Sequence, residues 1–133
     1  MKIVIPGKPR GKGRPRFGNG RTYTDKATRE YETLVATIAE QEMANIRATV
    51  TEKPVSVYII AHFAIPKSTP KKRIAEVLSN PPKTKPDVDN IAKIVLDALN
   101  GIVFADDRQV VSCTVEKVYS ESPCVEVIVK ENG

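Results

Sequence analysis

The chain has 133 residues, enough for one hydrophobic core but too few for two domains of ordinary size, so we expect a single domain over residues 1–133. Its 41% hydrophobic and 28% charged residues are typical of a globular protein, and no apolar run is long enough to cross a bilayer. No signal peptide is recognisable after Met1, which predicts a cytoplasmic protein with no membrane partner. Only 5% of the residues are aromatic, which argues against rows of base-stacking side chains.

The net charge of +5 is unevenly distributed. Fifteen of the 21 Lys and Arg residues lie in residues 1–29 and 67–85, and each of these segments contains one acid. Such segments suit a polyanion such as DNA, although a solvated, solubilising surface is the alternative. The cations that we expect to bind DNA are Lys8, Arg10, Lys12, Arg14, Arg16, Arg21, Lys71, Lys72, Arg73, Lys83 and Lys85.

The first elements predicted along the chain are a strand, a basic loop and a helix. Residues 1–6 predict a strand that is apolar on both faces and ends at a proline. Residues 7–21 hold five of the seven glycines, and we expect a mobile loop that becomes ordered on phosphates. A helix over 25–46 follows, with Thr24 as its N-cap. Its expected buried stripe is Tyr31, Leu34, Val35, Ile38, Ala39 and Ile46.

The middle of the chain predicts a strand and a short helix. Residues 55–65 are apolar at nearly every position, as in a central strand covered on both faces. His62 lies within this strand, where a core or edge position is the more common role. Pro70 is placed to begin a short helix that ends near Leu78.

An acidic stretch then stands out from the basic chain. Asp87 and Asp89 are two residues apart, so in extended backbone their side chains leave on the same side and can approach one cation. Asp89 or Asn90 is expected to cap the following helix, which Gly101 ends. The apolar stripe of that helix is Ile91, Ile94, Val95, Ala98 and Leu99, and its opposite face carries Asn90, Lys93 and Asp97.

The last third predicts a turn and two strands. Asp106 and Asp107 form the turn, and residues 109–119 and 123–130 predict an antiparallel hairpin with one buried face, which includes Val111. Cys113 and Cys124 lack metal-binding spacing and are expected to be reduced thiols. The predicted fold class is α+β, with a four-stranded mixed sheet, two main helices and a short third.

The acidic stretch has the components of metal-assisted phosphodiester hydrolysis. Clustered carboxylates suit a hard divalent ion such as Mg²⁺, which polarises a phosphate and activates water. Lys93 adds a positive charge where negative charge develops in the reaction. Taken singly, Asp89 is also a plausible helix cap, the pair Asp106 and Asp107 a polar turn, and Lys93 a solvated side chain.

Three motifs resemble the signature of the RusA family of Holliday junction resolvases: residues 85–93 (KPDVDNIAK), 97–101 (DALNG) and 104–110 (FADDRQV). Residues 5–9 (IPGKP), 12–16 (KGRPR) and 22–24 (TYT) are similar to its phage- and prophage-type branch. The resemblance implies a small, homodimeric, Mg²⁺-dependent endonuclease, with Mn²⁺ as an alternative ion. Such an enzyme makes paired nicks in four-way junction DNA during recombination and repair.

Carried over residue by residue, the resemblance implies that Asp87, Asp89 and Asp107 bind the metal and that Lys93 is catalytic. Asn90, Asp97 and Asp106 match supporting positions. Two other functions stay open, namely a non-catalytic nucleic-acid-binding protein and a metal-dependent hydrolase of nucleotides or RNA. Uptake of a divalent metal and cleavage of a four-way junction distinguish these functions from a junction nuclease.

Overall fold

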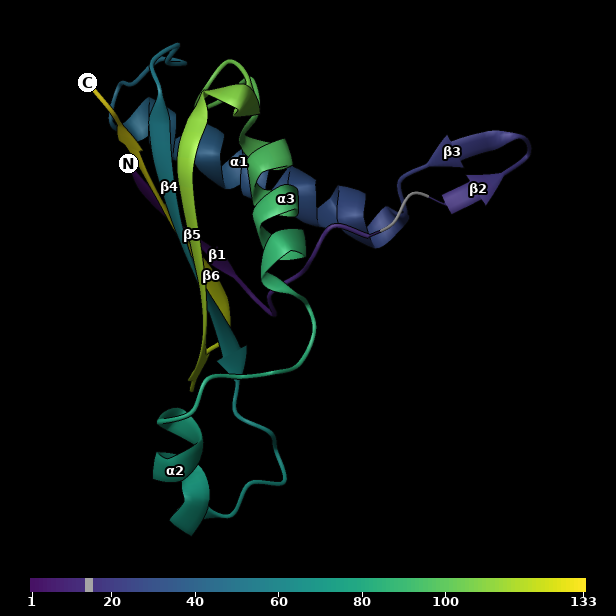
Figure 1. Ribbon diagram of the computed structural model, residues 1–133, viewed down its shortest axis with the longest axis vertical. Helices are drawn as coiled ribbons and strands as arrows, with labels where there is room; N and C mark the ends of the chain where they lie inside the picture. Colours follow the sequence, from purple (N-terminus) through teal and green to yellow (C-terminus); the bar gives the residue numbers. More distant parts are fainter. Residues whose placement is uncertain (14–15) are drawn as a thin grey trace.

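The computed structural model describes residues 1–13 and 16–133, in which a four-stranded sheet carries two long helices on one face (Figure 1). The α+β class, the mixed sheet, the two main helices and the short third helix are confirmed. The strands are β1 (Lys2–Pro6), β2 (Arg16–Gly18), β3 (Arg21–Tyr23), β4 (Val55–Ala64), β5 (Val110–Ser120) and β6 (Cys124–Glu131). The helices are α1 (Lys26–Asn45), α2 (Ile74–Leu78) and α3 (Val88–Leu99), with 3-10 turns η1 (Lys71–Arg73) and η2 (Asp107–Gln109).

The strand order in the main sheet is β1-β6-β4-β5, so β4 is central as expected. It pairs in parallel with β5 and antiparallel with β6. The prediction that β5 and β6 pair as a hairpin is therefore wrong. The link of residues 121–123 carries the chain past the end of β4, which lies between β5 and β6. Strand β4 therefore makes the backbone hydrogen bonds that we expected β5 and β6 to make with each other.

Only one face of the sheet is covered. Alternate residues of β4 are buried and the others half-buried, which corrects the expectation of two covered faces. The same holds for β1, where Val4 is 47% exposed. On β5, Val111 and Cys113 are exposed, because an edge strand gains less cover from the helices. On β6 the expected face is buried, namely Val125, Val127 and Val129.

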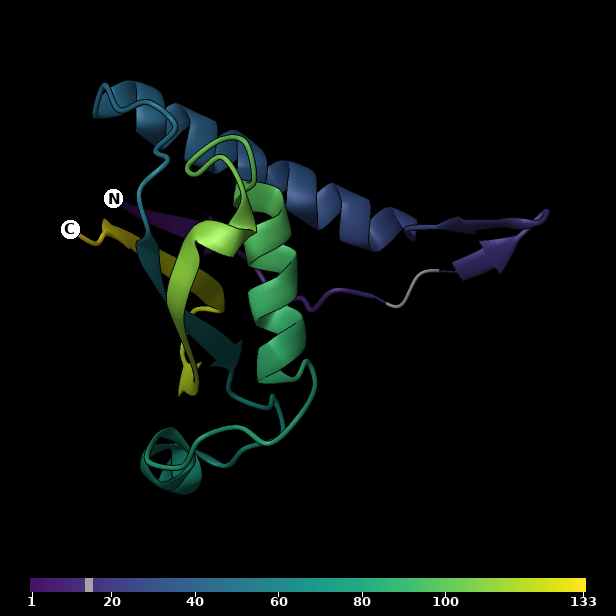
Figure 2. The same cartoon turned by 45° about the horizontal axis from the view of Figure 1, so that its top comes forward.

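Helices α1 and α3 pack on the covered face (Figure 2). The buried stripe of α3 is the expected one. That of α1 differs, since Leu34 and Ile46 are exposed whereas Thr28 and Met43 are buried. The N-cap of α1 is Asp25, not Thr24. In the part of the chain that the structure describes, no helix is both long and apolar enough to span a membrane.

Strands β2 and β3 form a separate hairpin, which we call the arm (residues 16–23). Its turn residues Asn19 and Gly20 have φ values of 53° and 73°, as a type I′ turn requires. We had expected no regular structure here, because the glycine-rich and basic composition obscured the Asn-Gly turn signal. Figures 1 and 2 show the arm projecting away from the sheet, beyond the N-terminal end of α1. Of the expected loop, Arg14 lies outside the described residues, and the loop's mobility stays a prediction.

Candidate functional site

A groove of about 590 Å³ lies where the segment after β1 meets the start of α3. Both cationic segments and the acidic stretch contribute to it, although they are far apart in the sequence. Its lining residues are Lys8, Pro9, Arg10, Gly11, Lys12, Lys85, Pro86, Asp87 and Asn90. The groove therefore combines cations with the proposed metal-binding carboxylate Asp87.

The segment of residues 8–12 lies directly against the first turn of α3. The backbone N–H of Lys12 donates to the carbonyl oxygen of Asn90 at 2.9 Å. A Cβ added at Gly11 would lie 2.8 Å from Cβ of Pro86 and 2.9 Å from Cβ of Asn90. Only glycine allows this close approach, so Gly11 determines how near the basic segment comes to the acidic one.

The N-cap of α3 is Asp87, two or three residues earlier than we expected, because the chain enters the helix at Val88. Asp87 has extended backbone, whereas Asp89 lies in the first turn, so the two carboxylates do not share an extended strand. The side chain of Asp87 makes no capping hydrogen bond, and both aspartates are exposed. Both carboxylates are therefore accessible to a cation, and that of Asp87 lines the groove.

Lys93 is exposed and follows Asp89 by one helical turn, so the two side chains share a face of α3. Asn90 and Asp97 are half-buried on the same side. The expected polar face of the helix therefore forms. Near its N-terminal end it carries a carboxylate, an amide and a lysine within the five residues 89–93.

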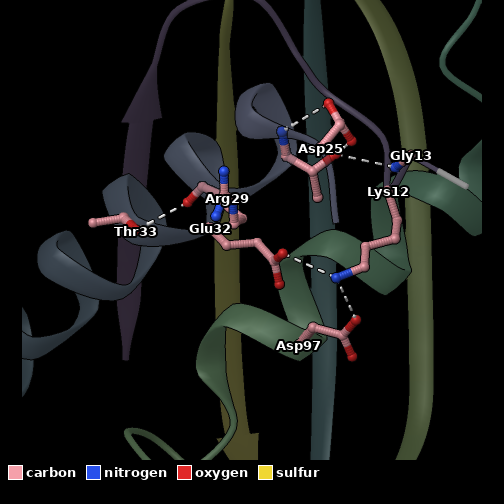
Figure 3. Close-up of polar contacts among 8 residues, drawn as sticks. Lys12, Gly13, Asp25, Arg29, Glu32, Thr33 and Asp97 are labelled. Atoms are coloured by element: carbon pink, nitrogen blue, oxygen red, sulfur yellow. Dashed lines mark hydrogen bonds and ion pairs between the residues drawn. The ribbon is translucent and has the colours of Figure 1, made fainter. Parts of the chain in front are cut away.

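Lys12 joins α1 to α3 (Figure 3). Its Nζ lies 2.9 Å from Oε1 of Glu32 and 3.3 Å from Oδ2 of Asp97, and its side chain is 17% exposed. Burial lowers the pKa of Lys12, but hydrogen bonds to the two carboxylates outweigh this effect and raise it above its usual value. Lys12 and Asp97 thus have structural partners, and the roles expected of them, DNA binding for Lys12 and support of the acidic site for Asp97, stay predictions.

A second contact, missed from the sequence, holds the basic segment to the start of α1 (Figure 3). The backbone N–H of Gly13 donates to the hydroxyl of Thr28 at 3.3 Å, and that hydroxyl donates to the carboxylate of Asp25. Asp25 also accepts the backbone N–H of Thr28, which is the N-cap interaction of α1. The Asp-x-x-Thr spacing is a recognisable cap signal, whereas its contact with Gly13 depends on tertiary structure.

Asp106 and Asp107 lie beyond the other end of α3. Asp106 forms a capping box with Gln109, whose side chain accepts the backbone N–H of Asp106 at 2.8 Å, and it pairs with Arg108 at 3.3 Å. Asp107 is exposed at the start of η2. Since α3 has twelve residues, its ends are about 18 Å apart, and Figure 1 shows η2, which begins at Asp107, beyond the end of α3 that is opposite to its N-cap Asp87.

The described residues of one chain contain no cluster of three His, Cys, Asp or Glu side chains that could hold a metal ion. The structure therefore brings Asp87 and Asp89 to one end of α3 and leaves Asp107 at the other. Carboxylate oxygens are the donors that hard divalent cations prefer, so Asp87 and Asp89 have the right chemistry for such an ion, but two carboxylates are fewer ligands than the ion usually takes from its surroundings.

The remaining expected DNA contacts lie on two projecting parts of the molecule. Lys71, Lys72 and Arg73 form η1 beside α2, and all three are exposed. Lys83 and Lys85 are exposed on the segment between α2 and α3. Arg21 is exposed on the arm, where residue 16 also lies. In Figures 1 and 2 the arm and α2 project on two sides of the N-terminal end of α3.

The cysteines and the histidine lie apart from the groove. Cys113 and Cys124 are free thiols, and partial burial of the sulfur, even in the exposed residue Cys113, raises the pKa of each. His62 lies on the uncovered face of the sheet, with Nε2 2.8 Å from a carboxylate oxygen of Glu126. This hydrogen bond, together with Lys2 at 3.2 Å, lowers the pKa of Glu126. His62 is thus half-buried on the central strand β4, which is neither the core nor the edge position that we named as the more common.

Two comparisons with known proteins bear on the groove. A sequence profile of the family described as endodeoxyribonuclease RusA matches residues 6–130, which include the groove and the whole of α3. The chain is also 40% identical over 139 residues to an uncharacterised protein, YqaN, of Bacillus subtilis (strain 168). That alignment covers 98% of this chain and 96% of the relative.

Proposed function

The chain belongs to the RusA endodeoxyribonuclease family, and on that premise we propose that it is a metal-dependent nuclease that resolves four-way DNA junctions by paired nicks in recombination and repair. The observation that carries the proposal is the groove, where exposed Asp87 adjoins the cations Lys8, Arg10 and Lys85. In such an arrangement the carboxylate can bind a metal ion, and the cations can hold a phosphodiester next to that ion. The family's phage- and prophage-type branch is the one that the N-terminal motifs resemble.

In this proposal Asp87 and Asp89 hold Mg²⁺, or Mn²⁺ in its place, at the start of α3. A bound divalent ion would lower the pKa of the attacking water and polarise the phosphate. Lys8, Arg10 and Lys85 hold the phosphate backbone against the groove. Lys93 stabilises the negative charge that develops on the scissile phosphate or the leaving oxygen.

The same proposal requires two copies of the chain. Paired nicks need one centre for each of two strands, which a homodimer supplies. Asp107, which the family resemblance assigns to the metal, follows the C-terminal end of α3, whereas Asp87 caps its N-terminal end, and the helix itself is about 18 Å long. We therefore assign the third carboxylate to Asp107 of a second copy, so that each centre contains residues from both chains.

A cleavage assay on a synthetic four-way junction with Mg²⁺ tests the function. Wild type should introduce paired nicks, whereas Asp89→Asn should bind the junction as tightly or more tightly and fail to cut it. The substitution removes a metal ligand and also removes a negative charge that repels phosphate. Equal cleavage by both proteins would contradict the proposal, and binding without cleavage by wild type would favour a non-catalytic binding protein.

Lys93→Ala belongs in the same assay, because it separates catalysis from binding. We expect junction binding and metal uptake to be retained and turnover to be lost by about 10²- to 10³-fold, as for other transition-state stabilising groups. An equal loss of binding would make Lys93 a phosphate contact instead. Mononucleotides, RNA and linear duplex, assayed side by side with the junction, would reveal a hydrolase with a different substrate.

A further inference from the structure

The arm carries two aromatic side chains that the core does not use. Phe17 is 77% exposed and Tyr23 is 51% exposed, in a chain with only seven Phe and Tyr residues. Strands β2 and β3 pair with each other and not with the four-stranded sheet. The arm therefore holds two large apolar rings in water without a packing reason for them, which indicates an interaction surface.

The register of the arm places the two rings on opposite faces. Tyr23 is opposite residue 16 and Phe17 is opposite Thr22, so neighbouring pairs point to different sides. The ring of Tyr23 lies against Gly18, where an added Cβ would be only 3.1 Å from Cε1 of the tyrosine. Gly18 thus lets this ring lie on the backbone, and the arm presents one flat aromatic surface on each side.

The charge around these rings selects the partner. Residues 8–23 contain six Lys and Arg residues and no acid, and Arg21 is exposed on the arm itself. Residues 8–12, which precede the arm in the sequence, line the groove, so the cations of this part of the chain are shared between the groove and the arm. A second copy of this chain also carries a net charge of +5 and offers no general electrostatic attraction. A nucleic acid combines a negatively charged phosphate backbone with bases whose flat faces stack on aromatic rings.

We propose that the arm binds unstacked bases of branched DNA, with Phe17 and Tyr23 as stacking surfaces and Arg21 as a neighbouring phosphate contact. Bases at a branch point are exposed in a way that bases within a linear duplex are not. The arm thus confers a preference for branched over linear DNA, while the groove cations bind any backbone. This inference rests on the proposed function, since it concerns the same DNA substrate.

Metal-free binding assays separate this role from catalysis. Fluorescence anisotropy in EDTA, at one fixed salt concentration, compares a single-stranded oligonucleotide, a four-way junction and a linear duplex. Phe17→Ala and Tyr23→Ala should each weaken binding to the single strand and the junction by about 5- to 150-fold, the effect of losing one base stack. Duplex binding should change by less than about twofold, because it depends on phosphate contacts.

Two further variants show whether the aromatic ring itself is responsible. Phe17→Trp should restore binding to the single strand and the junction, whereas Phe17→Leu, which keeps an apolar side chain without a ring, should not. Ile46→Ala is the matched control, because Ile46 is 49% exposed at the other end of α1. The arm variants should melt at the wild-type temperature, since neither ring packs in the core.

The possible results divide cleanly. The role of the arm would be overturned if the alanine variants bound the junction and the single strand as wild type does, or if Phe17→Leu bound them as tightly as wild type. Either result would leave the nuclease proposal standing. Loss of a dimer in sedimentation of the alanine variants would also overturn it, because the rings would then bind a second copy. Wild type that prefers branched DNA but never cuts it would instead refute the nuclease and support the arm.

Discussion

At the scale of single residues, Lys12 shows that a cation in a basic segment can serve the fold. Its ammonium group lies between carboxylates of α1 and α3, whereas Lys8 is exposed at the groove. Composition alone predicts the same role for both. The difference arises from helix packing, which decides which lysine meets two carboxylates and which one faces solvent.

We predict that Lys12→Met lowers the free energy of unfolding by about 1–2 kcal/mol, between the values for exposed and buried ion pairs. The substitution keeps most of the side-chain volume and leaves Glu32 and Asp97 without their shared cation. Lys8→Met is the control and should change stability by less than about 0.5 kcal/mol. Urea unfolding at neutral pH measures both, and equal stabilities would refute the structural role.

The pH dependence of this difference has a definite sign. The pKa of Lys12 is raised in the folded protein, so its stabilising contribution is complete below the ordinary lysine value of 10.5. The contribution is lost only as the pH rises through the raised folded pKa. The difference between wild type and Lys12→Met should therefore be constant from neutral pH to about pH 10 and shrink above that.

The sequence predicted that two carboxylates lie at the start of α3, but it did not predict their relative geometry. The Asp-x-Asp spacing identified Asp87 and Asp89, but the helix begins one residue after Asp87 and so separates their backbone conformations. A cap can lie at any of several nearby polar residues, and we expected Asp89 or Asn90 in place of Asp87. The fixed position depends on where the segment from α2 meets α3, which is a tertiary constraint.

At the scale of elements, the approach of residues 8–12 to α3 depends on one glycine. We predict that Gly11→Ala costs about 1–3 kcal/mol in stability, because the new methyl group would overlap side-chain atoms of Pro86 and Asn90. Gly11→Val should cost more. The displaced segment should also weaken DNA binding, since it carries Lys8 and Arg10 into the groove.

Thermal unfolding and DNA binding measured on the same preparations check this prediction. Wild-type stability of Gly11→Ala would mean that the segment moves aside at little cost. Normal stability with normal binding would show further that the contact with α3 does not position the cations.

The sequence led to two errors about hairpins: one hairpin that forms was not predicted, and one that was predicted does not form. The Asn19-Gly20 turn of the arm is a strong local signal that its basic, glycine-rich surroundings obscured. The short link of residues 121–123 suggested a hairpin that does not form, because β4 lies between β5 and β6. Local turn chemistry is visible in a sequence, whereas the insertion of a distant strand is not.

At the scale of the whole molecule, the fold class followed from the succession of strand and helix patterns. The strand order did not, since a parallel pair and a first strand beside the last one depend on long-range pairing. The separation of Asp87 from Asp107 by the length of α3 is a consequence of that arrangement. It makes the number of chains in each centre the main question about the assembled enzyme.

Mixing two inactive variants answers this question. Asp89→Asn and Asp107→Asn should each abolish cleavage alone. If each centre combines residues of two chains, the mixed dimer contains one centre with all wild-type carboxylates and should nick the junction on one strand. We expect nicking to appear after the two proteins are mixed and allowed to exchange subunits.

A centre built from one chain gives the opposite result. Every chain in the mixture would then carry a defect in its own centre, and no activity would return however long the subunits exchange. Mixing Asp89→Asn with Asp87→Asn is the matched control. Both substitutions lie at the same end of α3, so their mixture should remain inactive in either case.

The pairing of β1 with β6 also affects how the protein is made. β1 ends at Pro6, but its neighbour in the sheet, β6, begins at Cys124, so β1 cannot pair until β6 has been synthesised. Residues 8–12 follow β1 directly and reach α3 only when β1 is in place. A chain still on the ribosome therefore carries the basic segment and the acidic helix without the groove that joins them. We therefore expect the DNA binding and cleavage proposed for the groove to require that β6 has been synthesised.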